Sequence, residues 1–511
     1  MSWVTRLARA LTPAPRPVAL RSYVGAMMSR IRAGFNGGTV SADAANDGAI
    51  RTLRDRARQL VRDNAVAQSF VRLAADNIVG PDGFALEIRT ARDTAVADQI
   101  KAAFYAWCHA DACDVAGRLS FSDIERLVAE NWRGADGEAL IRLWRGYGPH
   151  GLQLQVLDPD LLDEAYERRA FAGQNEIVAG VEMNQFGKPV AYHLWTSHPT
   201  DAGPRERVRV PASDIIHVCR PSRPGQTRGV TAFAPVMRDL YHLGEMVHAT
   251  IVGQQVAAMQ TTWLRQTDPT APPIVANKDG TQDAIVSQEP AATNILPFGW
   301  EPMSVQPGIP QSTYAEFHRL AGHTIAVGLG THYAQLFGDA RDANASSQRV
   351  MTIRERRMWR ADQELLRRAL HDRVFRVWLE QAVIAGAVRL RGAPLASVQA
   401  EWLPTKWDWT DPMKDVNSAA LEIALGLNSR TAVAADKGRD FATIMRQRAT
   451  EEQLAASLGV TLYSPTTVML PPDEVEDATE DASEGEDEDD DEPGASAPAR
   501  VALLRAAGDR A

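Results

Sequence analysis

The stretch of sequence that decides the fold is RPGQTRGVTAFAPVMRDLYHL, residues 223–243. Its first half is rich in glycine and proline, which predicts a turn. Its second half begins a run of apolar residues spaced three to four apart, which predicts one face of a long helix ending near Trp263. An apolar face of this length must be buried against another element. The face consists of Val236, Leu240, Leu243, Val247 and Ile251.

Before this turn, the sequence predicts helices followed by short strands. Apolar residues at helical spacing indicate helices over 43–79, 93–109 and 120–134, the third capped by Ser120 or Ser122. From 138 to 220, short apolar runs separated by turn residues are typical of strands. We expect these strands to form one mixed sheet packed by the preceding helices. The expected strands are EALIRLWR, LQLQVLD, EIVAGVEMN, PVAYHLW and DIIHVCR.

After the long helix, the pattern predicts a small module and then more helices. Prolines, glycines and short apolar runs at 266–312 favour a strand-rich module. A helix is expected over 313–328, followed by the loop THYAQLFGDARDANASS and by the longest helix, at about 347–385. EWLPTKWDWTDP (401–412) is expected to be an irregular connector, and 413–458 a broken helical segment. The apolar face of the helix at 313–328 includes Phe317, Leu320 and Val327.

The two ends of the chain differ in charge from its body. Residues 1–42 hold six arginines and no acid, which favours a disordered basic arm. Residues 473–492 hold fourteen acids and no base, which favours a disordered acidic tail over 461–511, because such a segment cannot bury apolar surface. Without those fourteen acids, 51 acidic residues face 55 basic ones, so the net charge of −10 hides a mildly basic body.

Composition excludes several classes of protein. The 511 residues are 45% hydrophobic, enough for a buried core, yet no apolar run is long enough to span a membrane. Three cysteines in a chain of this length do not make a disulfide framework, which fits a reducing compartment. Cys108 and Cys113 flank His109, but a zinc site needs four ligands and nothing nearby supplies the others. We therefore expect no metal and no cofactor.

Motifs for catalysis are weak or missing in the sequence. It holds no phosphate-binding loop of the G-x-x-x-x-G-K-[ST] type and no G-x-S-x-G nucleophile elbow. His217 and Cys219 alternate on one predicted strand, but no third group orients them, which favours half-buried strand residues over a nucleophile pair. The acids of LDPDLLDE (157–164) suggest a two-metal nuclease, although proline and acids together favour a turn and a helix start. We expect no catalytic residues.

The longest helix is rich in arginine. Residues 349–376 hold nine arginines against four acids. One interpretation is a solvated helix with salt bridges to its neighbours. The other is that some arginines contact an adjacent subunit or a polyanion, since phosphate contacts need only charge and reach. The candidates for such contacts are Arg349, Arg354, Arg356 and Arg357.

The order of these segments resembles the lambda-type portal proteins of tailed phages. Residues 223–243 are the most specific match, a Gly-Gln-x-Arg-Gly turn leading into a long helix. Together the matching blocks sample residues 43–458, so the basic arm and the acidic tail lie outside the resemblance. The other blocks are LVRDNAVAQSFVRLAADNIVGPDGFAL (60–86), HTIAVGLGTHYAQLFGDARDANASSQRVM (323–351) and WDWTDPMKDVNSAALEIALGLNSRTAVAADKGRDFATIMRQR (407–448).

The resemblance implies an α+β portal fold and a function for each part. About twelve copies would form a ring at one capsid vertex of the virion, after assembly in the host cytoplasm. Double-stranded DNA would enter and leave the capsid through its channel. The implied parts are an α/β wing (43–230), a stem of two helices (231–263 and 313–330), a strand-containing clip (264–312), a tunnel loop (331–346), a long helix and wing return (347–412) and an α-helical crown (413–460).

The resemblance also implies partners and site residues. The partners are other copies of the chain, double-stranded DNA bound without sequence preference, the large terminase subunit, a head–tail connector, and the major capsid and scaffold proteins, with no membrane. The family's loop usually carries an Asn-Tyr-Ser-Ser-Ala-Arg-like run, whereas residues 344–349 read NASSQR, so the tyrosine is missing. Stem packing is expected from Leu240, Leu243, Val247, Ile251, Phe317 and Leu320, and contact with DNA from Asp339, Arg341, Asp342, Asn344, Ser346 and Ser347.

Two other classes of protein are compatible with the sequence. A metal-dependent DNA-processing enzyme is favoured by LDPDLLDE and by the arginine-rich helix. A non-viral oligomeric channel scaffold would use the same paired helices for assembly.

Overall fold

The computed structural model describes residues 39–90, 94–171, 173–258, 262–267, 270, 300–304, 311–339, 341, 345–392, 394–407, 412–437 and 441–460. The expected basic arm, except for its last residues, the acidic tail and most of the expected strand-rich module lie outside these residues. The chain divides into two compact units, residues 1–442 and 443–511, and every strand among the described residues lies in the first.

The first expected helix, 43–79, is three helices in the structure. They are α2 (Ala42–Asn46), α3 (Ile50–Asp63) and α4 (Ala65–Ile78). Asn64 separates α3 from α4 because its backbone is extended and its side chain accepts hydrogen bonds from the N–H groups of Val66 and Ala67, at 3.0 and 3.1 Å. The prediction of one continuous helix was wrong here because the asparagine caps a new helix.

The next helices cover a two-stranded sheet. Ser120 caps α7 through a capping box with Asp123, as the sequence predicted, and a π-helical turn, Glu130–Ala135, follows α7. Strand β1 pairs in antiparallel fashion with β11, so the first residues of the expected connector at 401–412 form a strand instead of an irregular segment. The elements are β1 (Ala85–Thr90), α5 (Thr94–Trp107), α6 (Ala110–Cys113), α7 (Phe121–Ala129) and β11 (Val398–Leu403).

The strands between 138 and 219 form two antiparallel sheets, and the expectation of one mixed sheet was wrong. One sheet has the order β3-β2-β8 and the other β4-β5-β6-β7, and every pairing in them is antiparallel. The expected strand EIVAGVEMN is a hairpin that turns at Ala179 and Gly180, both with positive φ. The strands are β2 (Glu138–Arg145), β3 (Leu152–Leu157), β4 (Glu176–Val178), β5 (Val181–Met183), β6 (Pro189–Trp195), β7 (Arg207–Pro211), which was not expected, and β8 (Ile215–Cys219).

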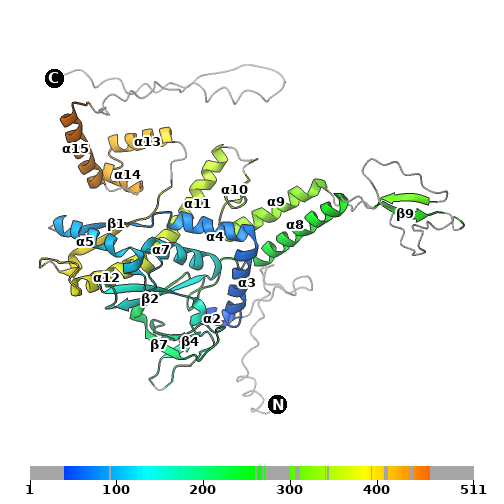
Figure 1. The fold of residues 1–511 in the computed structure, drawn as a ribbon, viewed down its shortest axis with the longest axis horizontal. Helices are drawn as coiled ribbons and strands as arrows, with labels where there is room; N and C mark the ends of the chain where they lie inside the picture. Colours follow the sequence, from blue (N-terminus) through cyan, green and yellow to red (C-terminus); the bar gives the residue numbers. More distant parts are fainter. Residues whose placement is uncertain are drawn as a thin grey trace, which may run out of the picture. The chain divides into compact units, whose positions relative to one another are not determined.

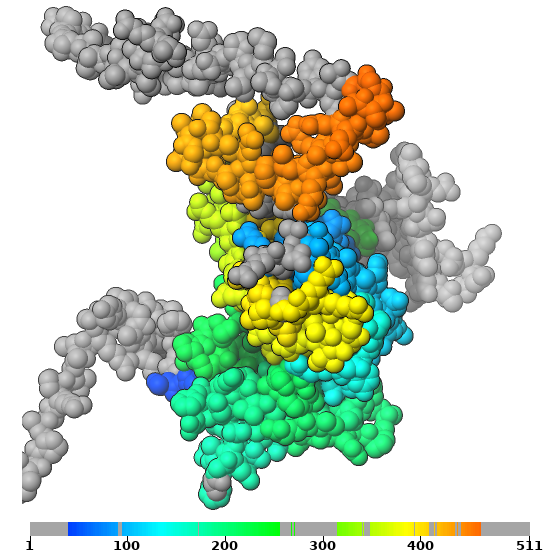
Figure 2. Space-filling model, turned by 90° about the vertical axis from the view of Figure 1, so that its left-hand side faces the viewer, coloured from blue at the N-terminus to red at the C-terminus, as the bar shows by residue number. Residues whose placement is uncertain are grey.

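Strand β2 is buried on both faces because it lies between two hydrophobic cores. Ile141 and Leu143 point into the larger core, whereas Leu140 points into a smaller core between the two sheets. An aromatic cluster fills the larger core, with Phe104 and Trp378 edge to face and their ring centroids 5.0 Å apart. Figure 2 shows the yellow helix α12 (Asp372–Ile384) at the surface, resting on the blue and cyan part of the chain.

Two helices that follow the turn at 223–231 in sequence lie side by side (Figure 1). They are α8 (Met237–Ala258) and α9 (Gln311–Leu329), and between them in sequence an antiparallel pair is described, β9 (Thr262–Gln266) and β10 (Trp300–Ser304). Among the described residues, no helix is both long and apolar enough to cross a membrane.

The loop expected at 331–346 contains a short helix, α10 (Tyr333–Phe337), and ends earlier than predicted, because α11 (Ala345–Leu366) begins before Ser347. A π-helical turn, Arg367–His371, joins α11 to α12, so the predicted long helix is present with one widened turn. The remaining elements are the helices α13 (Pro412–Ala424), α14 (Arg430–Asp436) and α15 (Phe441–Leu458), and the 3-10 turns Pro159–Leu161, Ala212–Asp214 and Leu395–Ser397.

Candidate functional site

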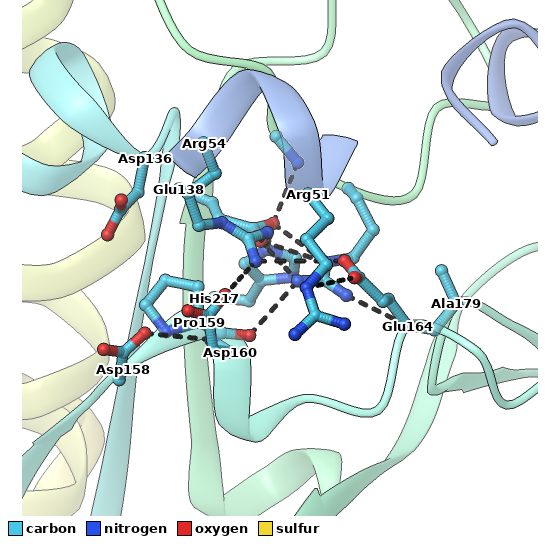
Figure 3. A network of polar contacts seen from close by, with 12 residues as sticks. Arg51, Arg54, Asp136, Glu138, Asp158, Pro159, Asp160, Glu164, Ala179 and His217 are labelled. Carbon is cyan, nitrogen blue, oxygen red and sulfur yellow. Dashed lines mark hydrogen bonds and ion pairs between the residues drawn. The ribbon is translucent and has the colours of Figure 1, made fainter. Parts of the chain in front are cut away.

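The Gly-Gln-x-Arg-Gly turn docks onto a buried carboxylate at the first residue of β2. Glu138 is fully buried and accepts hydrogen bonds from Arg228, Arg54, His217 and the backbone N–H of Gly229 (Figure 3). These donors come from α3, from β8 and from the turn that follows β8, so one side chain of β2 connects segments that lie 79 or more residues away on either side of it. The nitrogen–oxygen distances range from 2.5 to 3.1 Å, both to Arg228, and are 3.0 Å for Arg54 and His217.

Each residue of the motif has a separate physical role. Gly225 has a φ of +78°, a backbone conformation that favours glycine. The Gln226 side chain accepts from the Ser222 N–H at 2.8 Å and donates to the Arg228 carbonyl oxygen at 2.8 Å, which closes the turn on itself. The Thr227 hydroxyl donates to Asp43 at 2.7 Å and thereby ties the turn to α2.

Gly229 allows the turn to approach the start of β2 closely. A Cβ atom at this position would lie 2.2 Å from the carbonyl oxygen of Gly137. Gly137 meets the same restriction from the other side, because its Cβ atom would lie 2.2 Å from the Val230 carbonyl carbon. The two glycines therefore let the backbones touch, which brings Arg228 into reach of Glu138.

A second layer of ion pairs surrounds Glu138. Arg54 also contacts Asp160 at 2.5 Å, and Arg58 contacts Asp160, Asp136 and Asp158, each at 2.7 Å. Arg54 is buried, whereas Arg58 is about one quarter exposed. Asp158 and Asp160 of LDPDLLDE thus form ion pairs with two arginines of α3. Asp158 also caps the 3-10 turn Pro159–Leu161, in agreement with the turn and helix start that the sequence favours.

Burial and charge shift the pKa values of this network in opposite directions. Burial alone would raise the pKa of Glu138, but Arg228 and His217 outweigh it and hold that pKa well below its ordinary value. Burial would lower the pKa of His217, but hydrogen bonds to Cys219 and Glu138 raise it to about 9. The network is therefore a set of opposite charges at neutral pH.

The geometry does not support the catalytic interpretations of the sequence. Asp158, Asp160 and His198 bring three ligand atoms within 4.8 Å of one another, but Arg54 and Arg58 already neutralise the two carboxylates. Two guanidinium groups at the acids oppose the binding of a cation. His217 and Cys219 do share one face of β8, where His217 is engaged by Glu138. Cys108 and Cys113 are free thiols whose pKa values are raised by burial.

Of the loop at 331–346, the described residues 331–339 and 341 fold back onto α9. Asp339 accepts two hydrogen bonds from Arg341, at 2.9 and 3.0 Å, and lies 3.7 Å from Arg319 of α9. Tyr333 stacks on Phe337, with ring centroids 4.8 Å apart, along a groove of about 510 Å³. Arg341 is 81% exposed, so its charge faces solvent. Of the other loop residues named from the sequence, Asp342 and Asn344 lie outside the described residues, and Ser346 and Ser347 lie in the first turn of α11.

The arginines of α11 differ in their surroundings. Arg349, Arg354 and Arg357 are exposed, whereas Arg356 is half-buried and lies over the ring of Trp407 at 5.8 Å. Farther along the helix, Arg367 pairs with Glu364 and Asp372 at 2.7 and 2.8 Å. The salt-bridge interpretation therefore holds for Arg367, whereas contact of Arg349, Arg354, Arg356 or Arg357 with an adjacent subunit or a polyanion stays a prediction.

The six residues expected to pack the paired helices fall into two groups. Leu240 and Leu243 are buried in the large core, and Val247 is half-buried beside the groove. Ile251, Phe317 and Leu320 are 51%, 55% and 66% exposed within the single chain.

The described site is a structural network, in which buried charges hold segments of one chain together. Among the described residues, the acidic cluster at Asp158 and Asp160 is already neutralised by Arg54 and Arg58, and α8 and α9 leave apolar side chains exposed. Comparison with known families agrees: the family model described as "Phage portal protein, lambda family" matches residues 28–363, more than half of the chain. The chain belongs to the lambda family of phage portal proteins, which are structural components of the virion and not enzymes.

Individual relatives have similar lengths to this chain. The "Probable portal protein" of Halomonas phage phiHAP-1 is 29% identical over 90% of this chain and 93% of its own. "Portal protein B" of Escherichia phage lambda is 23% identical over 79% of this chain and 84% of its own. Among solved structures, a chain from the neck of an empty gene transfer agent particle aligns at 17% identity and a TM-score of 0.41, over 79% of this chain and 98% of that chain.

The sequence did not reveal the centre of the network. Glu138 was only the first letter of a predicted strand, and Arg54 and Arg58 were polar positions of a predicted helix. One signal was available: Glu138 is the first residue of a largely apolar strand, and a charge at the edge of such a strand needs a partner.

Proposed function

We propose that the chain forms a closed ring of about twelve copies at one capsid vertex, and that double-stranded DNA passes through its channel during packaging and ejection. The open apolar side chains of the paired helices carry this proposal. Phe317, Leu320 and Val327 follow one another on the exposed side of α9 and are 55%, 66% and 78% exposed. Exposed apolar stripes of this kind mark contact surfaces, and α9 presents this stripe in addition to its buried contacts with the core.

A ring follows if the stripe of one copy packs against a different surface of the next. Such a head-to-tail contact closes into a ring when the rotation between copies divides the circle evenly. Tyr241, Ile251 and Val252 of α8 are also exposed, at 56%, 51% and 43%, and supply a second apolar surface on the same helix pair. We assign this pair to the stem, over residues 231–263 and 313–330.

The other parts are assigned by their order along the chain. We propose the wing at 43–230, the clip at 264–312, the tunnel loop at 331–346, the long helix and return at 347–412 and the crown at 413–460. The strand β9 begins at Thr262, so its first two residues fall within the first stem segment and its last three within the clip. The clip is proposed to dock the large terminase and later the head–tail connector, and a partial deletion within 266–312 should abolish terminase binding in a pull-down.

The tunnel loop is proposed to face the DNA and to bind it weakly. Many identical subunits that each gripped phosphates tightly would stall the movement of DNA. Asp339 beside Arg341 gives the loop a nearly balanced charge, which suits weak and sequence-independent contact. The exposed Arg349, Arg354 and Arg357 extend the positive charge into α11 and are proposed to contact DNA or a neighbouring copy.

The function is tested by co-assembly with the major capsid and scaffold proteins and the terminase of the same phage. We expect DNA-filled particles with one ring each when the chain is present, and empty particles when it is omitted. Filled particles without the chain would contradict the proposal. A nuclease assay with Mg²⁺ tests the rival function of a metal-dependent enzyme, whose candidate ligands Asp158 and Asp160 are already paired with Arg54 and Arg58.

A further inference from the structure

Three consecutive residues, 329–331, attach the end of α9 to the π-helical turn Glu130–Ala135 and to α11. The Leu329 carbonyl oxygen accepts a hydrogen bond from Arg133 at 3.0 Å. Gly330, with a φ of +77°, lies so close to α11 that an added Cβ atom would be 2.8 Å from Met358 Sδ. The Thr331 hydroxyl then donates to Oε1 of Glu355 at 2.6 Å. The tunnel loop, which begins at Thr331, therefore starts from a fixed point on α11.

Glu355 is an unusual residue for this buried position. Its exposed fraction is 5%, and Thr331 and the Trp359 indole N–H, at 3.3 Å, both donate to the same oxygen, Oε1. The other oxygen, Oε2, is buried without a hydrogen-bond partner, and no lysine, arginine or histidine of the described residues lies within ion-pair distance. A buried carboxylate with one unsatisfied oxygen is unfavourable. Packing alone would place an apolar side chain here.

A second carboxylate of α11, that of Asp362, contacts the end of α9 indirectly, through the guanidinium group of Arg133. Asp362 is fully buried and lies seven residues after Glu355, so both side chains project from one side of the helix. Asp362 forms an ion pair with Arg133, with Oδ2 3.1 Å from Nε, and Arg133 in turn donates a hydrogen bond to the Leu329 carbonyl oxygen. Farther along the loop, in α10, the Leu336 carbonyl oxygen accepts a hydrogen bond from the Ser69 hydroxyl of α4 at 3.2 Å. Hydrogen bonds therefore hold the loop at its root, Thr331, and at Leu336, whereas Arg341 is exposed.

We infer that Glu355 is a positioning residue that sets the direction in which the tunnel loop leaves α9. Its hydrogen bond with Thr331 directly joins the side chain of the first loop residue to α11. Through this contact, a displacement of the stem helix moves α11, and a displacement of α11 moves the loop. The inference deepens the proposed function, since the loop matters only if it faces DNA.

Hydrogen–deuterium exchange on the full-length assembled protein tests the contact. Thr331→Val removes the donor with almost no change in shape, and we expect the Gly330 and Thr331 amides to exchange about tenfold faster, in proportion to the loss of one buried hydrogen bond. Thr331→Ser keeps the hydroxyl and should restore wild-type exchange. Thr250→Val is the matched control, because the Thr250 hydroxyl bonds only to Met246 of its own helix α8. Unchanged exchange at the loop root in Thr331→Val would overturn the inference.

Substitutions of Glu355 give an independent test. Glu355→Gln keeps an acceptor oxygen and should leave the exchange of the loop root near wild type. Glu355→Leu removes the acceptor and should raise it as Thr331→Val does, while the sheet β3-β2-β8 keeps its protection. A rise spread equally over that sheet would show global destabilisation and would count against the inference. Packaging is then measured with the same variants. A local rise in exchange with normal packaging leaves the positioning role intact and contradicts the proposed DNA contact of the loop.

Discussion

Arg228 and Glu138 form a fully buried ion pair, in which the guanidinium Nε of Arg228 lies 3.0 Å and 3.1 Å from the two carboxylate oxygens of Glu138. The pair joins the turn that precedes α8 to the first residue of β2. Arg228 also donates to the Ala179 carbonyl oxygen at 3.1 Å, in the β4–β5 hairpin. The start of the stem helix is therefore fixed relative to both sheets, which a ring requires if every copy is to present the same interface.

Breaking this pair should strongly destabilise the protein. Arg228→Met leaves Glu138 short of its main partner, and we expect the free energy of unfolding to fall by about 3–5 kcal/mol. Arg209→Met is the control, because Arg209 pairs with Glu182 while half-exposed and should change stability by less than about 1 kcal/mol. The double variant Arg228→Met/Glu138→Gln should recover part of the loss. Urea unfolding followed by tryptophan fluorescence measures all three, and equal losses for Arg228→Met and Arg209→Met would contradict the assignment.

Stability should fall between neutral and alkaline pH because of His217. Its folded-state pKa is raised to about 9 from an ordinary 6.5, so its contribution is fully present below pH 6.5 and is lost as the pH rises through 9. The groups responsible are Glu138 and Cys219, which bond to the ring. In His217→Gln this decline should be smaller. Urea midpoints at pH 6, 7.5 and 9 check the prediction, and parallel pH profiles for the two proteins would refute it.

A charge in the open stripe of α9 should prevent assembly without unfolding the subunit. Leu320 is 66% exposed in the single chain, so Leu320→Asp removes little core packing but places a carboxylate in the proposed interface. We expect mass photometry to show subunits in place of rings, with an unchanged far-ultraviolet circular dichroism spectrum. Phe186→Asp, at an equally apolar and 83% exposed position in a hairpin turn, is the control and should still form rings. Rings of normal size from Leu320→Asp would rule out this surface.

The tunnel loop should affect DNA and not assembly. Arg341→Ala removes the exposed guanidinium and releases Asp339, and we expect rings of normal size but altered packaging or retention of DNA. Packaged DNA length in co-assembled particles is the measurement. Wild-type packaging by this variant would remove the loop from the mechanism.

Divalent metal should have no effect on the acidic cluster. Arg54 and Arg58 already neutralise Asp158 and Asp160, so Mg²⁺ or Mn²⁺ should neither raise the melting temperature nor produce cleavage of DNA. Metal-dependent cleavage that disappears in Asp160→Asn would revive the rival enzyme.

The sequence predicted elements wherever the local pattern was unambiguous. Strand β2 was predicted with the bounds that the structure shows, because EALIRLWR is apolar on both faces and bounded by glycines. The break at Asn64 was missed because an asparagine inside a helical pattern is read as tolerated unless its capping hydrogen bonds are seen. The hairpin at Ala179 was missed because positive φ at a non-glycine residue leaves little trace in the sequence.

The site was predicted less well than the fold, for a physical reason. The motif at 223–229 was recognised as specific, but its partner Glu138 lies 90 residues earlier along the chain. Pairings over such a separation depend on the tertiary fold and not on local spacing. Glu355 illustrates the same limit, since its contact with Thr331 exists only once α9 and α11 are packed together.

The central claim is that many copies of this chain close around a duplex through the stem helices. Negative-stain images of the purified full-length protein, viewed down the particle axis, test it most directly. The account predicts rings of about twelve subunits with a central hole wide enough for double-stranded DNA. Single subunits without a hole, at every protein concentration tried, would contradict it.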